Sequence, residues 1–186
     1  NDLVARALSG GIALGSSVGV GVSSSAIDST GTTTALLAQN AEVQSSASFS
    51  DAAHATQDIL AIGVSAAAAD SNAVAGVATV ITSANSVQAL LALNSSVTSA
   101  GSVTLGARND FDTFSIAGGA AGGGSNGIGA AASVITVDNV TRAALADGTG
   151  TGDAVVIDAG GAVAISADAT ETGTTLTAAG AAAGEV

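Results

Sequence analysis

The sequence predicts an all-β protein, specifically a β-solenoid (parallel β-helix) of 54-residue repeats with about two coils per repeat. The first reason is repetition: residues 61–92 align without a gap to residues 115–146 and share Ile, Ser-Asn, Val-Ile-Thr and Asn at matching positions. The second is that the copies are rich in Val, Ile and Thr and are punctuated by Gly, Asn and Asp, which favours strands and turns. The third is composition. The chain is 47% hydrophobic but has 25 Gly, three Phe and no Trp, Tyr, Met, Cys or Pro, so its elements must pack closely around a thin core.

Several sets of positions keep an apolar residue in every copy of the repeat. The sets are Leu8, Ile62 and Ile116; Ile27, Ile81 and Ile135; Ala35, Ala89 and Ala143; Leu37, Leu91 and Leu145; and Phe49, Val103 and Val163. The last set stays aligned only if about six residues are inserted at 147–154, after which Leu176 falls into the row of Ile116. We expect the Ile, Leu and Val rows to face inward and to stack as ladders.

These rows divide the chain into repeats at approximately 8–61, 62–115 and 116–175, with a partial copy at 176–186. All of them belong to a single β-solenoid segment. Because the chain begins and ends within the repeat pattern, we expect it to be a fragment of a longer chain or filament.

Alternating segments such as "SVTLGA", "AVVIDA" and "AVAISADA" predict short strands separated by turns. Since the repeat is long for one coil, we expect two coils of about 27 residues in each repeat. One is an ordinary coil, such as residues 87–112, and the other is rich in Ala and Gly, such as residues 113–139. Asn85 and Asn139 occupy equivalent positions and would form a polar ladder at a corner.

Glycine-rich stretches such as "GGAAGGGSNGIG" need a structural reason, because glycine in a strand costs conformational entropy. One interpretation is that they form tight corners with positive φ and let the walls of the coil approach closely. The alternative is that they form a flat face of small residues that packs against a neighbouring filament.

Charge and hydropathy exclude several classes of function. The 15 Asp and Glu against three Lys and Arg give a net charge of −12, so we expect no nucleic-acid partner. The longest apolar runs, such as residues 59–69, are shorter than the ~20 residues of a transmembrane helix, so we expect none. Without lysine there is no phosphate-binding "GxxxxGK[ST]" loop.

Few residues are candidates for a chemical site. His54 is the single histidine and aligns with Arg108, which favours a solvated edge over catalysis. Calcium could bind the carboxylates of Asp110 and Asp112, or those of Asp147 and Asp153, although ordinary turn chemistry also explains these residues. We expect no other cofactor.

Threonine rows would be needed for an ice-binding face. Thr32 aligns with Ser86 and Val140, and Thr34 aligns with Gln88 and Arg142. The alignment therefore breaks any threonine array across the copies.

The pattern that runs from "AGGAAGGGSNGIGAAASVITVDNVTRAAL" to "AVAISADA" resembles the repeats of large bacterial filamentous adhesins, the haemagglutinin-like and leukotoxin-like surface proteins. The resemblance covers residues 8 to 184 and rests on a low-complexity pattern; the first copy departs from it at "SSSAIDSTGTTTALL". It implies a β-solenoid at the cell surface that serves in attachment or matrix building.

We therefore expect a non-enzymatic, extracellular structural segment, a β-solenoid rod of a cell-surface adhesin or surface filament. Its partners would be neighbouring repeats or copies of itself, together with an unknown host, surface or matrix ligand. The alternative is a binding module whose solenoid face recognises ice or a glycan.

Overall fold

The computed structural model describes residues 1–146 and 154–184, and these ranges contain strands and turns without a helix. The all-β prediction is therefore confirmed. It follows that no helix of the described residues could cross a lipid bilayer.

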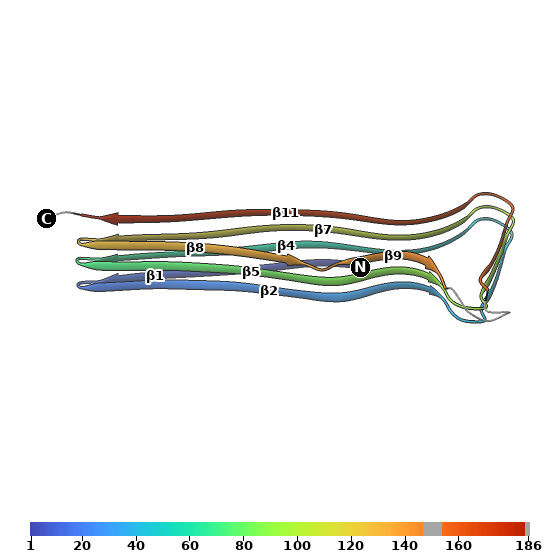
Figure 1. Cartoon of the computed structure of the whole chain (residues 1–186), viewed down its shortest axis with the longest axis horizontal. Helices are drawn as coiled ribbons and strands as arrows, with labels where there is room; N and C mark the ends of the chain where they lie inside the picture. Colours follow the sequence, from blue (N-terminus) through green and yellow to red (C-terminus); the bar gives the residue numbers. More distant parts are fainter. Residues whose placement is uncertain (147–153, 185–186) are drawn as a thin grey trace.

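The strands form three parallel sheets, which we call sheets A, B and C. Sheet A contains β1 (Asp2–Gly15), β4 (Phe49–Ala69), β7 (Val103–Gly123) and β11 (Val163–Ala183). Sheet B contains β2 (Val18–Leu37), β5 (Asn72–Leu91), β8 (Asn126–Val137) and β9 (Val140–Leu145), the last two pairing with different parts of β5. Sheet C contains the short strands β3 (Glu42–Ser45), β6 (Ser96–Ser99) and β10 (Val156–Ala159). The chain visits A, B and C in turn and then returns to sheet A beside its previous strand (Figure 1).

The pairing register follows the sequence repeat. Leu8 pairs with Ile62, Ile62 with Ile116, and Ile27 with Ile81, so that each residue lies beside its equivalent in the next copy. Beyond the predicted insertion the offset becomes six larger, because Val163 pairs with Val103 and Leu176 with Ile116. The pairing offsets of the described strands thus agree with the alignment of the repeats and with the six-residue shift.

The prediction of about two coils per repeat is wrong. Paired residues on neighbouring strands are separated by a whole repeat, and none of the sheet pairings in the described ranges joins residues half a repeat apart. The reason is strand length: β4 and β7 have 21 residues each and β5 has 20, so two long strands and one short strand use up the whole repeat. The long strands run along the longest axis of the molecule, and the coils stack at right angles to them (Figure 1).

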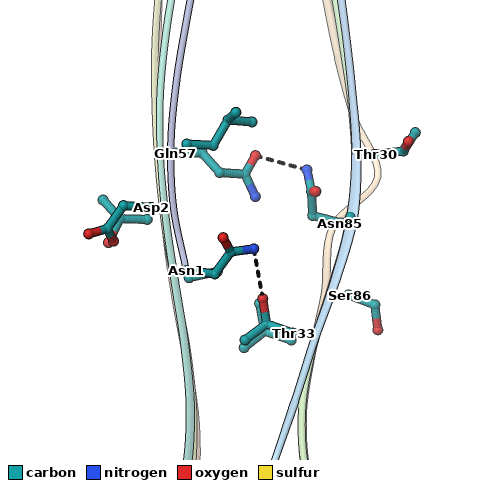
Figure 2. A pocket seen from close by; sticks show the side chains of 12 residues that line it. Asn1, Asp2, Thr30, Thr33, Gln57, Asn85 and Ser86 are labelled. Atoms are coloured by element: carbon teal, nitrogen blue, oxygen red, sulfur yellow. Dashed lines mark hydrogen bonds between the residues drawn. The ribbon is translucent and has the colours of Figure 1, made fainter.

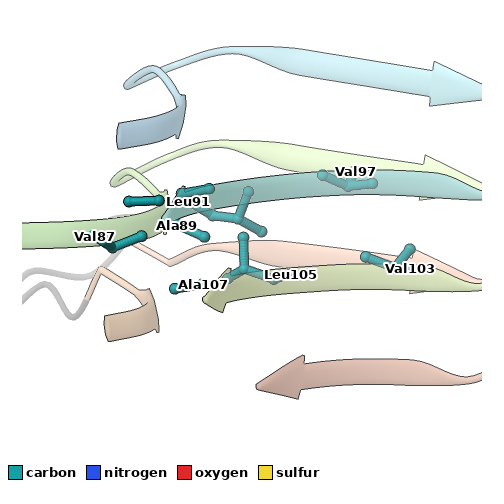
Figure 3. Packing of buried hydrophobic residues seen from close by; sticks show 9 residues of the cluster. Val87, Ala89, Leu91, Val97, Val103, Leu105 and Ala107 are labelled. Carbon is teal, nitrogen blue, oxygen red and sulfur yellow. The ribbon is translucent and has the colours of Figure 1, made fainter. Parts of the chain in front are cut away.

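Side chains alternate strictly between the interior and the outside. In β4, β5 and β7 the buried residues are the odd-numbered ones. The rows of Ile81, Ala89, Leu91 and Val103 face inward as predicted, and these four residues are at most 1% exposed. At the end of the molecule that carries sheet C, residues of all three sheets form one cluster around Val87, Leu91, Val97 and Leu105 (Figure 3).

The row of Leu8, Ile62, Ile116 and Leu176 was predicted to face inward, and this is wrong. These even-numbered residues lie on the outer side of sheet A, where Leu8 is 72% and Leu176 is 56% exposed. Because a strand has a period of two, a continuous strand cannot bury both Ile59 and Ile62. Ile59 is the buried one, with no exposed surface.

The interior narrows toward the end where sheet A passes into sheet B. There the turns are very short, as between Gly15 and Val18 and between Gly123 and Asn126, each of which leaves two residues outside the strands. The two backbones lie so close that a Cβ atom on Gly119 would be 2.6 Å from the carbonyl oxygen of Ala130. Close approach of the walls is therefore the role of these inward glycines.

The other expectation for glycine, tight corners with positive φ, is wrong for the described residues. None of their glycines has such a φ, whereas Asn40 and Asn94 do, at 60° and 58°. Both lie in the same turn of successive coils, since Ala41 N donates to Ala38 O at 3.1 Å and Ser95 N donates to Ala92 O at 3.2 Å. Asparagine tolerates this conformation better than other residues with a side chain.

Asn94 gives a test of this turn. We expect Asn94→Ala to lower the free energy of unfolding by about 1 kcal/mol, because alanine is strained in the left-handed region. Asn94→Gly should leave it nearly unchanged, because glycine adopts this region freely. Urea unfolding followed by circular dichroism measures both. Equal losses would contradict this explanation and would instead assign the role of Asn94 to its side-chain amide.

Candidate binding surfaces

The outer face of sheet A is divided into two halves of different chemistry. The half near sheet C carries charged side chains, and we call it the charged half; its outward residues include Asp2, Arg6, His54, Asp58, Arg108, Asp110, Asp112 and Asp168. The half near the two-residue turns is the apolar half, made of the outward, even-numbered residues of 8–14, 62–68, 116–122 and 176–182. These four segments contain no charged residue.

An ion cluster stands on the charged half. Arg108 Nε donates to Asp110 Oδ2 at 2.8 Å, and Arg108 Nη2 donates to Asp110 Oδ1 at 3.1 Å. His54, the register neighbour of Arg108, places its Nε2 3.1 Å from Asp110 Oδ2. Hydrogen bonds from Arg108 and then from His54 lower the pKa of Asp110 below its usual value. The cluster is a solvated surface feature, as the alignment of His54 with Arg108 predicts.

The arginine is the main cause of this shift, which sets up a direct test. We expect Arg108→Ala to raise the pKa of Asp110 toward its ordinary value, as read from the carboxyl carbon in an NMR titration. A carboxyl group with a lowered pKa stabilises the fold at pH values above its unfolded-state pKa. This stabilisation is lost as the pH falls through the folded-state pKa, so the variant should lose this small dependence of stability on pH in the acid range. Arg142→Ala, which removes an arginine from sheet B, is the matched control. Identical Asp110 titrations in the two variants would contradict this assignment.

Two of the four calcium candidates, Asp110 and Asp112, lie within the described residues. Asp110 and Asp112 both lie on the outer side of β7, and both oxygens of Asp110 already accept hydrogen bonds. Asp147 and Asp153 lie outside the described residues, so calcium binding there stays a prediction. In residues 1–146 and 154–184, no group of three His, Asp or Glu side chains is placed to hold a metal ion.

The outer face of sheet B has no threonine row that crosses its described strands. Thr32 pairs with Ser86, which pairs with Val140, and Thr34 pairs with Gln88. The register thus breaks the array in the way the alignment predicts, and it offers no regular lattice for ice.

A polar network crosses the interior between sheets A and B. Asn85 Nδ2 donates to Gln57 Oε1 and to Ser83 Oγ, both at 2.8 Å, and Asn85 N donates to Asn139 Oδ1 at 3.0 Å. The predicted contact between Asn85 and Asn139 is therefore present. It lies midway along sheet B, between β8 and β9, and not at a corner as expected.

Sequence reasoning missed Gln57, the partner of Asn85 from the opposite sheet. The residues that pair with Gln57 on the neighbouring strands are Leu3 and Phe111, so the repeat shows no polar row at this position. Only its odd residue number, which it shares with the inward-facing residues of β4, would have indicated that Gln57 faces the interior. A cavity of about 150 Å³ opens beside it at the β1–β2 edge, where Asn1 Nδ2 donates to Thr33 Oγ1 at 3.2 Å (Figure 2). This cavity is small, its lining mixes polar side chains with Leu3 and Val87, and it lies where a further coil would stack.

Asp51 is the carboxylate that the interior partly covers. It lies on the inner side of β4 beside Leu105, and burial raises its pKa. Its Oδ2 atom is buried without a hydrogen-bond partner among the described residues.

No protein-family model, no curated protein and no solved structure matches this chain.

Proposed function

We propose that the chain is a non-enzymatic structural segment, a β-solenoid in which each coil uses one whole repeat. One observation carries the proposal: neighbouring coils pair in parallel, residue by residue, through sheets A, B and C in turn. The number of coils in such a stack is not fixed by its geometry. Each coil that pairs with the previous one leaves an equivalent strand edge free to pair with the next.

The mechanics of a rod follow from this geometry. Backbone ladders join each coil to the next along strands of up to 21 residues, and inward rows such as Ile27, Ile81 and Ile135 stack between the sheets. The strands at both ends of the stack offer unpaired backbone groups, which favour pairing with further repeats or copies. The acidic surface, with a net charge of −12, keeps such a stack dispersed in water.

We also propose that this rod belongs to a cell-surface adhesin or surface filament outside the cell. Support comes from the resemblance of the Ala- and Gly-rich segments and the "AVAISADA" strand to filamentous haemagglutinin-like repeats. The absence of cysteine fits an exterior location as well as an interior one, so it does not decide the question.

Adding coils tests the structural proposal. Residues 62–115 form one complete repeat, and chains carrying two, four or eight extra copies of it after residue 115 should fold into stacks that lengthen by about 4.8 Å per copy. Small-angle scattering measures the length, and each copy should raise or preserve the melting temperature. Particles of constant length, or a melting temperature that falls with each copy, would contradict the proposal.

Location needs a separate experiment. Antibodies raised against the purified segment should label intact cells that produce the protein. Labelling that appears only after the cells are broken would contradict the surface assignment and leave the stacking proposal standing.

A further inference from the structure

We infer that the apolar half of sheet A binds the apolar half of a second copy of this chain, so that stacks associate face to face. This inference extends the proposed structural role, because it adds a lateral contact to the stacking along the coil axis. Nothing in it depends on where the protein is located.

In the apolar half of sheet A, small residues lie inside and large residues lie outside. In this half the inward positions beside the Leu8 row hold small residues, such as Ala61, Gly63 and Ala117, because the two sheets are too close for larger ones. The large side chains of the row point outward instead, on all four strands of sheet A. A sheet that places its small residues inside and its large aliphatic residues outside carries an exposed apolar patch of the kind that marks an interface.

The outer face of the apolar half has a ridge and flat rows. The row of Leu8, Ile62, Ile116 and Leu176 forms the ridge, and next to it β4, β7 and β11 carry mostly Ala and Gly in the rows that follow, as at Ala66, Ala120 and Gly180. In the same rows β1 carries the exposed side chains of Ile12 and Leu14. Consider a two-fold axis that lies in the plane between the two faces and is perpendicular to the strands. It places the ridge of one copy on the flat rows of the other, and the same contact forms twice. On β4, β7 and β11 the surface is therefore complementary to itself.

The acidic charge of the chain limits how two copies can meet. Copies with a net charge of −12 repel each other, and an interface must keep their acidic groups apart. The two-fold arrangement does so, because each charged half extends beyond the opposite end of the partner. Asp58 and Asp112 of the two copies then stay far apart.

Area sets the strength of the contact. Four strands about 4.8 Å apart, each contributing about eight residues of about 3.3 Å, cover roughly 500 Å². A stable interface takes roughly 800 Å² from each partner, so this segment should associate weakly and at high concentration. Each further coil adds about 130 Å², so association should tighten steeply with the number of repeats.

Sedimentation of the native chain over a wide concentration range is the test, together with two matched pairs of substitutions. Ile62→Asp with Ile116→Asp places two charges on the apolar half and should abolish association. Val80→Asp with Val134→Asp makes the same change on the outer face of sheet B, where both valines are exposed, and should leave association intact. Circular dichroism confirms the β fold of each variant.

A single cysteine decides the matter even if the aspartate variants fold poorly. The chain has no cysteine of its own. Gly118→Cys lies on the apolar half between the ridge at Ile116 and the row of Ala120, where the two-fold axis brings it next to its own copy, so it should give disulfide-linked dimers at high concentration, whereas Ala78→Cys on the outer face of sheet B should not.

The results separate this inference from the proposed function. Native chain that stays monomeric throughout, or association that Val80→Asp with Val134→Asp abolishes instead, would overturn the lateral contact. Lengthened chains that still form stacks but no longer associate laterally, when Ile62→Asp is made in every copy of the repeat together with Ile116→Asp, would support both conclusions. Bundles that survive these aspartates would refute the inference alone.

Discussion

Gly119→Val is expected to destabilise the fold by about 3 kcal/mol, because it forces side-chain atoms into a tightly packed interior. A Cβ atom at this position would meet the carbonyl oxygen of Ala130 at 2.6 Å. That oxygen belongs to the backbone of the opposing sheet, so only a movement of the whole sheet can relieve the contact. Urea unfolding followed by far-UV circular dichroism measures the loss.

Gly122→Val supplies the control within the same strand. Gly122 lies further along β7, where a Cβ atom would meet nothing within 4 Å. Valine there should leave the free energy of unfolding unchanged or raise it slightly, because β-branched residues favour strands. Equal destabilisation by the two substitutions would show that the sheets are not in close contact at Gly119.

Ile81→Ala is expected to lower the free energy of unfolding by about 3 kcal/mol, the usual cost of removing a large buried aliphatic side chain. Ile81 has no exposed surface and packs with Ile59 and Phe111 between the two long sheets. Its neighbours cannot close the gap, because the backbone ladders on both sides hold the sheets apart.

Ile62→Ala removes the same atoms from the outer face of sheet A. Because Ile62 lies outside the core, we expect a loss of about 1 kcal/mol or less when the protein is dilute. This pair of substitutions tests the alternation of inner and outer residues. A larger loss at Ile62 than at Ile81 would mean that the alternation is reversed.

The repeat, the class of secondary structure and the register could be predicted because each leaves a periodic trace in the sequence. Parallel pairing in register places identical positions of the repeat next to each other, so the alignment of Ile27 with Ile81 is also their contact. The shift at 147–154 was visible for the same reason, since Val163 and Leu176 return to the rows of Val103 and Ile116.

The length of the coil could not be predicted in the same way. Strands in globular proteins usually have roughly three to ten residues, and Gly and Asn normally interrupt them. Here β7 continues for 21 residues through "AGGAAGG", because the opposing sheet lies close enough to need glycine and alanine. The sequence therefore suggested turns, and with them two coils per repeat, where the strand is unbroken.

The candidate surfaces were harder to predict for a related reason. Both sides of sheet A are apolar near the two-residue turns, so apolar character could not tell Ile59, which is buried, from Ile62, which is not. Only the parity of a continuous strand separates them. The ion cluster of His54, Arg108 and Asp110 was partly visible, because the repeat already aligned His54 with Arg108.

We propose that one coil uses a whole repeat, and electron paramagnetic resonance with pairs of nitroxide labels tests this coil length most directly. Ser24→Cys with Ala78→Cys places labels on register neighbours of β2 and β5, about 4.8 Å apart along the ladder. Ser50→Cys with Ala78→Cys places them half a repeat apart, where two coils per repeat would make them neighbours. We predict strong dipolar broadening for the first pair and none for the second. Broadening in the second pair without broadening in the first would contradict the account.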